Sequence, residues 1–146
     1  MKLISHRGHT DGILSGQDNK PEYILQALEK GFDVEIDVWC FGDGGYWLGH
    51  DKPQYHVDEN YLENPKFWCH AKNIEALYEM QRNGIHCFWH QEDDVTLTSE
   101  GYMWTYPGKR LTKNSIAVLP EKKLDVEIAG ICSDYVERYK DDFTGY

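Results

Sequence analysis

Residues 33–40 read DVEIDVWC and form the clearest β-strand in the chain. Their β-branched and aromatic side chains alternate with Glu35 and Asp37, and this period of two is typical of a strand. The segment just before it, Pro21–Lys30, starts with proline, carries an apolar stripe and is followed by Gly31. These features predict a helix that leads directly into the strand.

Outward from this strand, the chain alternates between expected strands and helices. Asn19 is expected to cap the first helix and Asn73 the second. The other expected elements are a helix at Ile74–Arg82 and strands at Leu3–Ser5, Tyr46–Leu48, Phe67–Lys72, Ile85–His90, Tyr102–Tyr106, Ser115–Leu119 and Gly130–Asp134. Strands that alternate with helices predict a parallel sheet with right-handed crossovers.

The expected fold class is therefore α/β, as a minimal TIM-type (β/α) barrel in which several helices are reduced to loops. A full barrel normally takes about 250 residues, and this chain has 146. An open α/β sheet is the structural alternative. No long linker or clear repeat interrupts the sequence, so residues 1–146 are read as one domain.

Composition excludes several classes of protein. The formal net charge is −10, and no basic face is visible, which argues against a general nucleic-acid binder. The four cysteines form no CxxC pair, so zinc-ribbon and thioredoxin sites are excluded and reduced core thiols are expected. The first strand begins at Lys2, which leaves no room for a signal peptide, and no apolar run is long enough to span a membrane. Together these two features predict a cytoplasmic protein.

Glu35 and Asp37 lie two positions apart on one strand, so their carboxylates share a face. Two buried carboxylates repel each other unless a cation joins them. Oxygen ligands suit Mg²⁺, Ca²⁺ or Mn²⁺, and a divalent metal ion is the expected cofactor. The alternative is that both residues sit at the exposed end of the strand and pair with Lys or Arg.

Two histidines stand just beyond strand ends. His6 is followed by Arg7, and His50 is followed by Asp51. Two imidazoles suit the acid and base that phosphodiester cleavage needs, and the forked guanidinium of Arg7 suits phosphate oxygens. A single histidine is more often a structural hydrogen-bonding residue, so the pattern counts for more than either residue alone.

Together these segments resemble the signature of the glycerophosphodiester phosphodiesterases. The resemblance is strong over residues 4–51 and extends to 66–72 and 130–135. The matching motifs are His6-Arg7-Gly8, Asn19-Lys20-Pro21-Glu22, Glu35-Ile36-Asp37-Val38, Gly49-His50-Asp51 and a closing Gly130-Ile-Cys-Ser-Asp134-Tyr135.

The resemblance implies a barrel with its catalytic residues at the carboxyl ends of the strands. It makes His6 and His50 the acid–base pair, Glu35 and Asp37 metal ligands, and Arg7 a phosphate contact. The substrate would be a small phosphodiester, attacked by water or by one of its own hydroxyl groups.

The sequence departs from the family at the end of the Phe67–Lys72 strand. Lys72 matches a lysine of the family pattern and is expected to contact phosphate. His70 stands where the family has a carboxylate, so we expect His70 as the third metal ligand. The alternative is that His70 only donates a hydrogen bond to the substrate phosphate, while water fills the third position at the metal.

The middle of the chain offers further candidates. His90 and Trp104 are expected to contact substrate, although closing the barrel and packing the core are the competing interpretations. The spacing of His86 and His90 also permits a zinc hydrolase. The other alternative is an inactive binding module for phosphorylated glycerol or sugar. The oligomeric state is left open.

Overall fold

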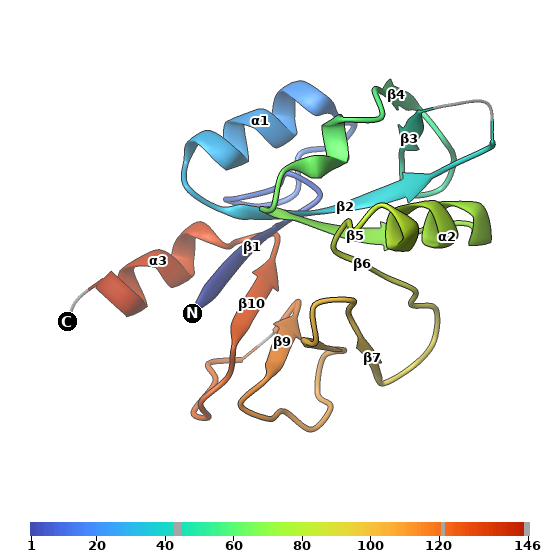
Figure 1. The fold of residues 1–146 in the computed structure, drawn as a ribbon. Coiled ribbons are helices and arrows are strands. Elements are labelled where there is room, and N and C mark those ends of the chain that lie inside the picture. The colour runs from blue at the N-terminus through green and yellow to red at the C-terminus, as the bar shows by residue number, and fades with distance from the viewer. Residues whose placement is uncertain (43–44, 121, 145–146) are drawn as a thin grey trace.

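The computed structural model describes residues 1–42, 45–120 and 122–144 of the chain. Within these ranges the structure has three helices, and its ten strands belong to one curved sheet (Figure 1). In chain order the elements are β1 (Lys2–His6), α1 (Pro21–Glu29), β2 (Asp33–Trp39), β3 (Tyr46–Leu48), β4 (Tyr55–Val57), a 3₁₀ turn η1 (Tyr61–Glu63), β5 (Phe67–Ala71), α2 (Ile74–Arg82), β6 (Cys87–Phe88), β7 (Val95–Leu97), β8 (Met103–Thr105), β9 (Ser115–Val118), β10 (Gly130–Ser133) and α3 (Glu137–Thr144).

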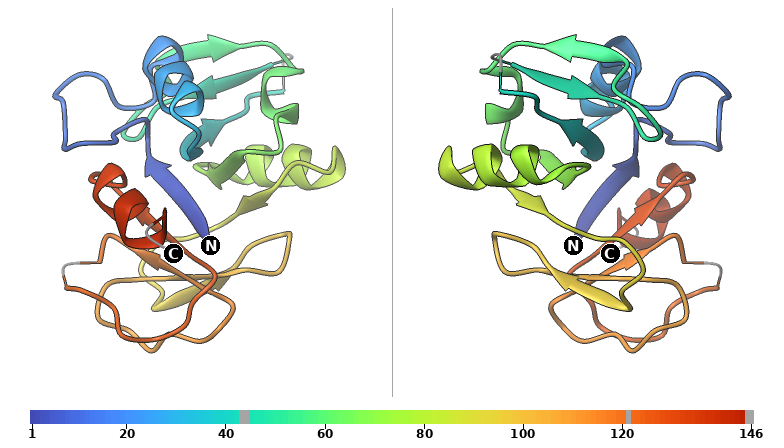
Figure 2. Two further views of the ribbon diagram at one scale, coloured as in Figure 1. Left: turned by 90° about the vertical axis from the view of Figure 1, so that its left-hand side faces the viewer. Right: turned by 90° about the vertical axis from the view of Figure 1, so that its right-hand side faces the viewer.

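The main part of the sheet is parallel. Its strands follow the order β6-β5-β2-β1-β10-β9-β8, so the first and last strands of the chain are neighbours. The β3–β4 hairpin extends β2 by antiparallel pairing, and β7 pairs antiparallel with β8. Figure 2 shows α1 and the hairpin at one end of the molecule, β7 to β9 at the other, and α2 between them.

The predicted α/β class is confirmed, since the described residues form a ten-stranded sheet with few helices. Strand pairing does not close this sheet within the described ranges, because β6 pairs only with β5 and β7 pairs only with β8. A direct link does cross the opening, since the Ser99 amide donates to the Cys87 carbonyl over 2.8 Å. The full barrel stays a prediction.

The two faces of the sheet have separate apolar layers. On β2, Val34, Ile36 and Val38 belong to the cluster that includes residues of α1 and α2. The opposite face carries a cluster built from six different parallel strands: Ile4, Trp68, Phe88, Trp104, Ile116, Val118 and Cys132. Glu35 and Asp37 alternate with the helix-facing valines and isoleucine, so they lie on the second face.

Two predicted helix caps had different outcomes. The Asn73 side chain accepts a hydrogen bond from the Ala76 amide, and this cap is confirmed. The cap assigned to Asn19 is wrong, because Lys20 occupies the N-cap position of α1 and makes no side-chain cap bond. Pro21 already removes one free amide from that first turn, which lowers the need for a cap.

Several element boundaries also differ from expectation. The strand expected at Ile85–His90 is reduced to Cys87–Phe88. β4, β7, η1 and α3 are short elements that periodicity did not predict. All four cysteines are buried and unpaired, as expected. Within the described ranges, none of the helices has the length and apolar character needed to cross a bilayer.

Candidate functional site

Strand register brings four of the predicted site residues together at the carboxyl ends of the central strands. His6, the last residue of β1, is the register partner of Glu35 on β2. Asp37, two residues further along β2, is the partner of His70 on β5. Because partners on adjacent parallel strands point the same way, these side chains share one face.

Glu35, Asp37 and His70 form a group that could hold a metal ion. One ligand atom from each residue lies within 4.8 Å of the others. His70 Nδ1 lies 3.2 Å from Asp37 Oδ1 and 3.8 Å from Glu35 Oε2. Glu35 Oε1 and Asp37 Oδ1 are buried without a hydrogen-bond partner among the described residues. Buried oxygens without partners are costly, and a cation would satisfy them, so the residues fit a divalent ion.

The orientation of His70 favours this interpretation. Its Nε2 lies 2.8 Å from the backbone carbonyl of His90, which can only accept a hydrogen bond, so Nε2 must carry a proton. Nδ1 is then the nitrogen that faces the two carboxylates, and a cation bound between them would accept its lone pair. A metal-binding histidine commonly has its second nitrogen fixed in this way. Stacking on Phe88, at 5.2 Å between ring centroids, also restrains the ring.

The two carboxylates have opposite pKa shifts. Burial and the charge of Asp37 raise the pKa of Glu35 well above its usual 4.5. Burial acts on Asp37 in the same direction, but contacts with His50 and His70 and the charge of Arg7 hold its pKa well below its usual 3.8. The pair therefore resists carrying two negative charges, and a divalent ion would relieve that resistance.

His6 has a partner to which the sequence had assigned no role. Its Nδ1 lies 2.8 Å from Asp134 Oδ1, and its Nε2 lies 3.9 Å from Glu35 Oε1. Asp134 follows β10, which pairs with β1. The carboxylate fixes the ring and leaves Nε2 directed toward the metal group. The only sequence signal for Asp134 was its place in the closing motif.

His50 approaches the same group from the turn that follows β3. Its Nδ1 lies 3.5 Å from Asp37 Oδ2, and its side chain keeps 39% of its surface exposed. Gly49 makes this turn possible, because its φ is +154° and an added Cβ would collide with the Lys52 carbonyl oxygen. His50 is thus the most accessible of the histidines in this group.

Arg7 is held among acceptors that belong to the protein. Its Nε lies 3.1 Å from Asp37 Oδ2, NH1 lies 3.3 Å from Asp18 Oδ2, and NH2 lies 3.4 Å from His50 Nε2. Burial acts to lower its pKa, but Asp37 and Glu35 raise the value overall. Arg7 therefore compensates the charge of Asp37. The sequence had predicted only a phosphate contact for this residue.

The remaining predicted substrate contacts lie in different surroundings. Lys72 follows β5, and its charge acts to lower the pKa of Glu35. His90 is buried beside Tyr106, at 3.8 Å between ring centroids, and neither of its ring nitrogens has a hydrogen-bond partner within the described ranges. Trp104 belongs to the core layer, with 3% of its surface exposed and its ring 4.7 Å from Phe88. Its position matches the core-packing interpretation.

His86 and His90 do not form a common site. His86 contacts Thr98 and Glu100, with its Nε2 lying 2.8 Å from Thr98 Oγ1 and its Nδ1 3.2 Å from Glu100 Oε2. His90 lies beyond the other end of β6, next to His70 and Tyr106. Of the described residues, only Glu35, Asp37 and His70 form a group of three or more possible ligands.

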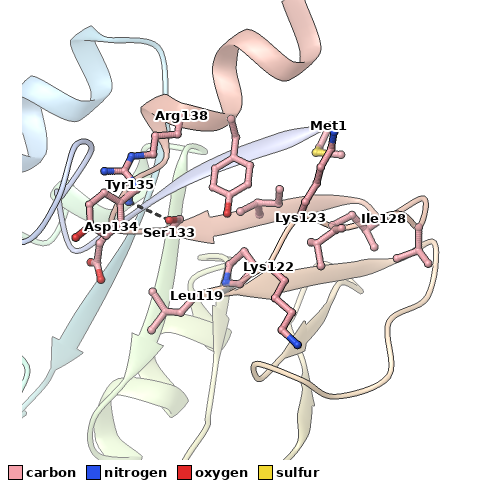
Figure 3. A pocket seen from close by; sticks show the side chains of 14 residues that line it. Met1, Leu119, Lys122, Lys123, Ile128, Ser133, Asp134, Tyr135 and Arg138 are labelled. Carbon is pink, nitrogen blue, oxygen red and sulfur yellow. Dashed lines mark hydrogen bonds between the residues drawn. The ribbon is translucent and has the colours of Figure 1, made fainter.

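A cavity of about 970 Å³ lies between α3 and the connection from β9 to β10, and Asp134, the partner of His6, is one of its lining residues. Lys122, Lys123 and Arg138 contribute positive charge to its lining, and Arg138 lies 4.1 Å above the Tyr135 ring. Figure 3 shows Asp134 at the opposite end of this cavity from Met1 and Lys123. Because none of the possible metal ligands lines the cavity, we place the candidate site at the Glu35 group.

In comparisons with known proteins, no family model, curated protein or solved structure matches the chain. The resemblance to glycerophosphodiester phosphodiesterases stays a prediction that rests on the motifs quoted above.

Proposed function

We propose that this protein is a cytoplasmic, metal-dependent phosphodiesterase that acts on a glycerophosphodiester or a related small phosphodiester. One observation carries the proposal: a possible metal group (Glu35, Asp37 and His70) lies at the same end of the sheet as two histidines suited to proton transfer. A divalent ion would also relieve the repulsion between the two buried carboxylates, of which Arg7 directly contacts only Asp37.

Glu35, Asp37 and His70 would hold a divalent ion, Mg²⁺, Ca²⁺ or Mn²⁺. Such an ion would neutralise charge on the substrate phosphate and make its phosphorus more electrophilic. Lys72 would add positive charge on the same side, and Arg7 would contact the phosphate in addition to holding Asp37. These local cations would let a protein of net charge −10 accept an anion.

His6 and His50 would move the two protons of the reaction. One histidine takes the proton from the attacking water or substrate hydroxyl as its oxygen bonds to phosphorus. The other gives a proton to the leaving alcohol oxygen as its bond to phosphorus breaks. Asp134 orients His6 through Nδ1, so His6 Nε2 is the atom that would exchange the proton.

We also infer that the sheet is a reduced TIM-type barrel. Support comes from the core layer, in which β1, β5, β6, β8, β9 and β10 each contribute a side chain to one cluster. The contact between Ser99 and Cys87 spans the two sides of the opening. In such a barrel, the Glu35 group lies at the end where active sites form.

A panel of glycerophosphodiesters with different alcohols, assayed with Mn²⁺ or Mg²⁺ and again with a chelator, tests the function. Turnover that requires the metal and is lost in His6→Ala supports the enzyme. Saturable binding of phosphorylated glycerol or sugar without turnover of any ester would contradict it and favour the binding module. If turnover is found, His90 and Lys72 are the residues to vary in order to test substrate preference.

A further inference from the structure

Asn19 occupies an unusual backbone position next to the candidate metal group. It is completely buried, and its φ of +63° lies in the left-handed region. Among residues with a side chain, asparagine tolerates this conformation best, because its short amide can hydrogen-bond locally. Its backbone amide donates to the Arg7 carbonyl over 3.0 Å. The end of the loop before α1 is thereby tied to the end of β1.

The Asn19 side chain is directed at Asp37 through both of its polar atoms. Oδ1 accepts a hydrogen bond from the Asp37 amide at 2.9 Å, and Nδ2 donates to Asp37 Oδ2, also at 2.9 Å. Both bonds are buried, so solvent does not compete for them. Two bonds to one residue fix the direction of its carboxylate as well as its place.

This arrangement distinguishes the two oxygens of Asp37. Oδ2 receives Asn19 Nδ2 and also lies 3.1 Å from Arg7 Nε and 3.5 Å from His50 Nδ1. Oδ1 is buried and has no hydrogen-bond partner within the described ranges. It faces His70 Nδ1 at 3.2 Å, inside the possible metal group.

We propose that Asn19 is a positioning residue for metal binding, which keeps Asp37 Oδ1 directed toward the cation by engaging Oδ2. The inference rests on the proposed metal site and adds a residue that supports it from outside the ligand group. Residues that orient metal ligands commonly change metal affinity about 10- to 100-fold when they are removed.

Asn73 offers a matched control. Its side chain also links the start of a helix to the β2 region, because Oδ1 accepts from the Cys40 amide and Nδ2 donates to the Cys40 carbonyl. It contacts none of the possible ligands in the hydrogen bonds described. Asn19→Gly and Asn73→Gly therefore both remove an amide that makes two hydrogen bonds to the β2 region, buried for Asn19 and partly buried for Asn73, but only the first removes a contact with Asp37.

The experiment is a titration of the full chain with Mn²⁺. Binding is measured by calorimetry and by the electron paramagnetic resonance signal of free Mn²⁺. We expect Asn19→Gly to weaken Mn²⁺ binding about tenfold or more, and Asn73→Gly to lower the melting temperature with the dissociation constant unchanged. Glycine keeps the left-handed conformation at position 19, so backbone strain does not enter the comparison.

The double variant Asn19→Gly/Asp37→Asn tests whether Asn19 acts through Asp37. If it does, removing Asn19 has little further effect once the Asp37 charge is gone, and the two changes are strongly non-additive. Equal Mn²⁺ affinity of wild type and Asn19→Gly, or simple additivity, would overturn the inference while leaving the proposed function intact. Absence of Mn²⁺ binding by the wild type would instead count against the proposed function.

If Asn19→Gly is unfolded without metal, the Mn²⁺ concentration that restores its far-ultraviolet circular dichroism gives the comparison. Refolding at the concentrations expected from the wild-type dissociation constant would overturn the inference, because binding to the native state would be unchanged.

Discussion

His6 Nδ1 lies 2.8 Å from Asp134 Oδ1, although 128 positions separate the two residues in the chain. The contact exists because β1 and β10 pair in parallel, with Ser5 opposite Ser133. A carboxylate hydrogen-bonded to one imidazole nitrogen fixes the orientation of the ring and leaves the other nitrogen for proton transfer. The proposed proton transfer at His6 therefore depends on the closing segment of the chain.

Asp134→Asn tests this dependence. The amide can still contact Nδ1, but it supplies no negative charge when the ring accepts a proton. We expect a lower kcat with KM and Mn²⁺ affinity little changed, and a loss smaller than that in His6→Ala. Steady-state kinetics on a confirmed substrate make the measurement. A kcat equal to that of the wild type would show that His6 does not need Asp134.

His6→Ala and His50→Ala address the acid–base pair directly. Positioned acid–base catalysis contributes a factor of about 10² to 10⁴, so each variant should lose turnover on that scale. Neither residue belongs to the ligand group, so metal binding and the melting temperature should stay close to wild type. Two variants with wild-type rates would show the mechanism to be wrong.

Metal binding should stabilise the protein, because a ligand that binds only the folded state raises its stability. With free metal at about 100 times the dissociation constant, we expect a rise in melting temperature of roughly 5–10 °C relative to chelator. Asp37→Asn should reduce this rise, whereas the exposed Asp58→Asn should not. An identical melting temperature in chelator and in millimolar divalent ion would remove the main support for the metal site.

His70→Glu should change the preference among metals. A nitrogen ligand favours Mn²⁺, Co²⁺ or Zn²⁺ over Ca²⁺, and a carboxylate in its place favours Ca²⁺ or Mg²⁺. We therefore expect activity and metal-induced stabilisation to be greater with Mn²⁺ than with Ca²⁺ in the wild type, and to shift toward Ca²⁺ or Mg²⁺ in His70→Glu. If His70 instead donates to the substrate phosphate, the glutamate would raise KM by repulsion without reordering the metals. An unchanged order would exclude His70 as a ligand.

Glu35 predicts how the metal-free protein responds to pH. Its folded-state pKa is raised above the usual 4.5, so it favours folding at low pH, and this stability is lost as pH rises through the folded pKa. In chelator, the melting temperature of the wild type should fall relative to Glu35→Gln from about pH 4.5 upward. Saturating metal should abolish that difference. A parallel pH course of the two proteins would contradict the prediction.

The sequence by itself determined the local features of the site. Alternation along Asp33–Trp39 placed Glu35 and Asp37 on one face, because successive strand residues point in opposite directions. Helix signals predicted α1 and α2 and the Asn73 cap, since these depend on contacts within a few residues. The α/β class followed from the order of the elements alone.

Tertiary structure decided which partners these side chains meet. Asparagine is a common helix-capping residue, yet the side chain of Asn19 binds Asp37. It does so because the buried carboxylate and backbone amide of Asp37 offer it two hydrogen bonds. Trp104 lies in the core, and Asp134 reaches His6, through strand pairings between distant segments. Local periodicity fixes the direction of a side chain, but the group it faces depends on long-range packing, which no pattern of neighbouring residues encodes.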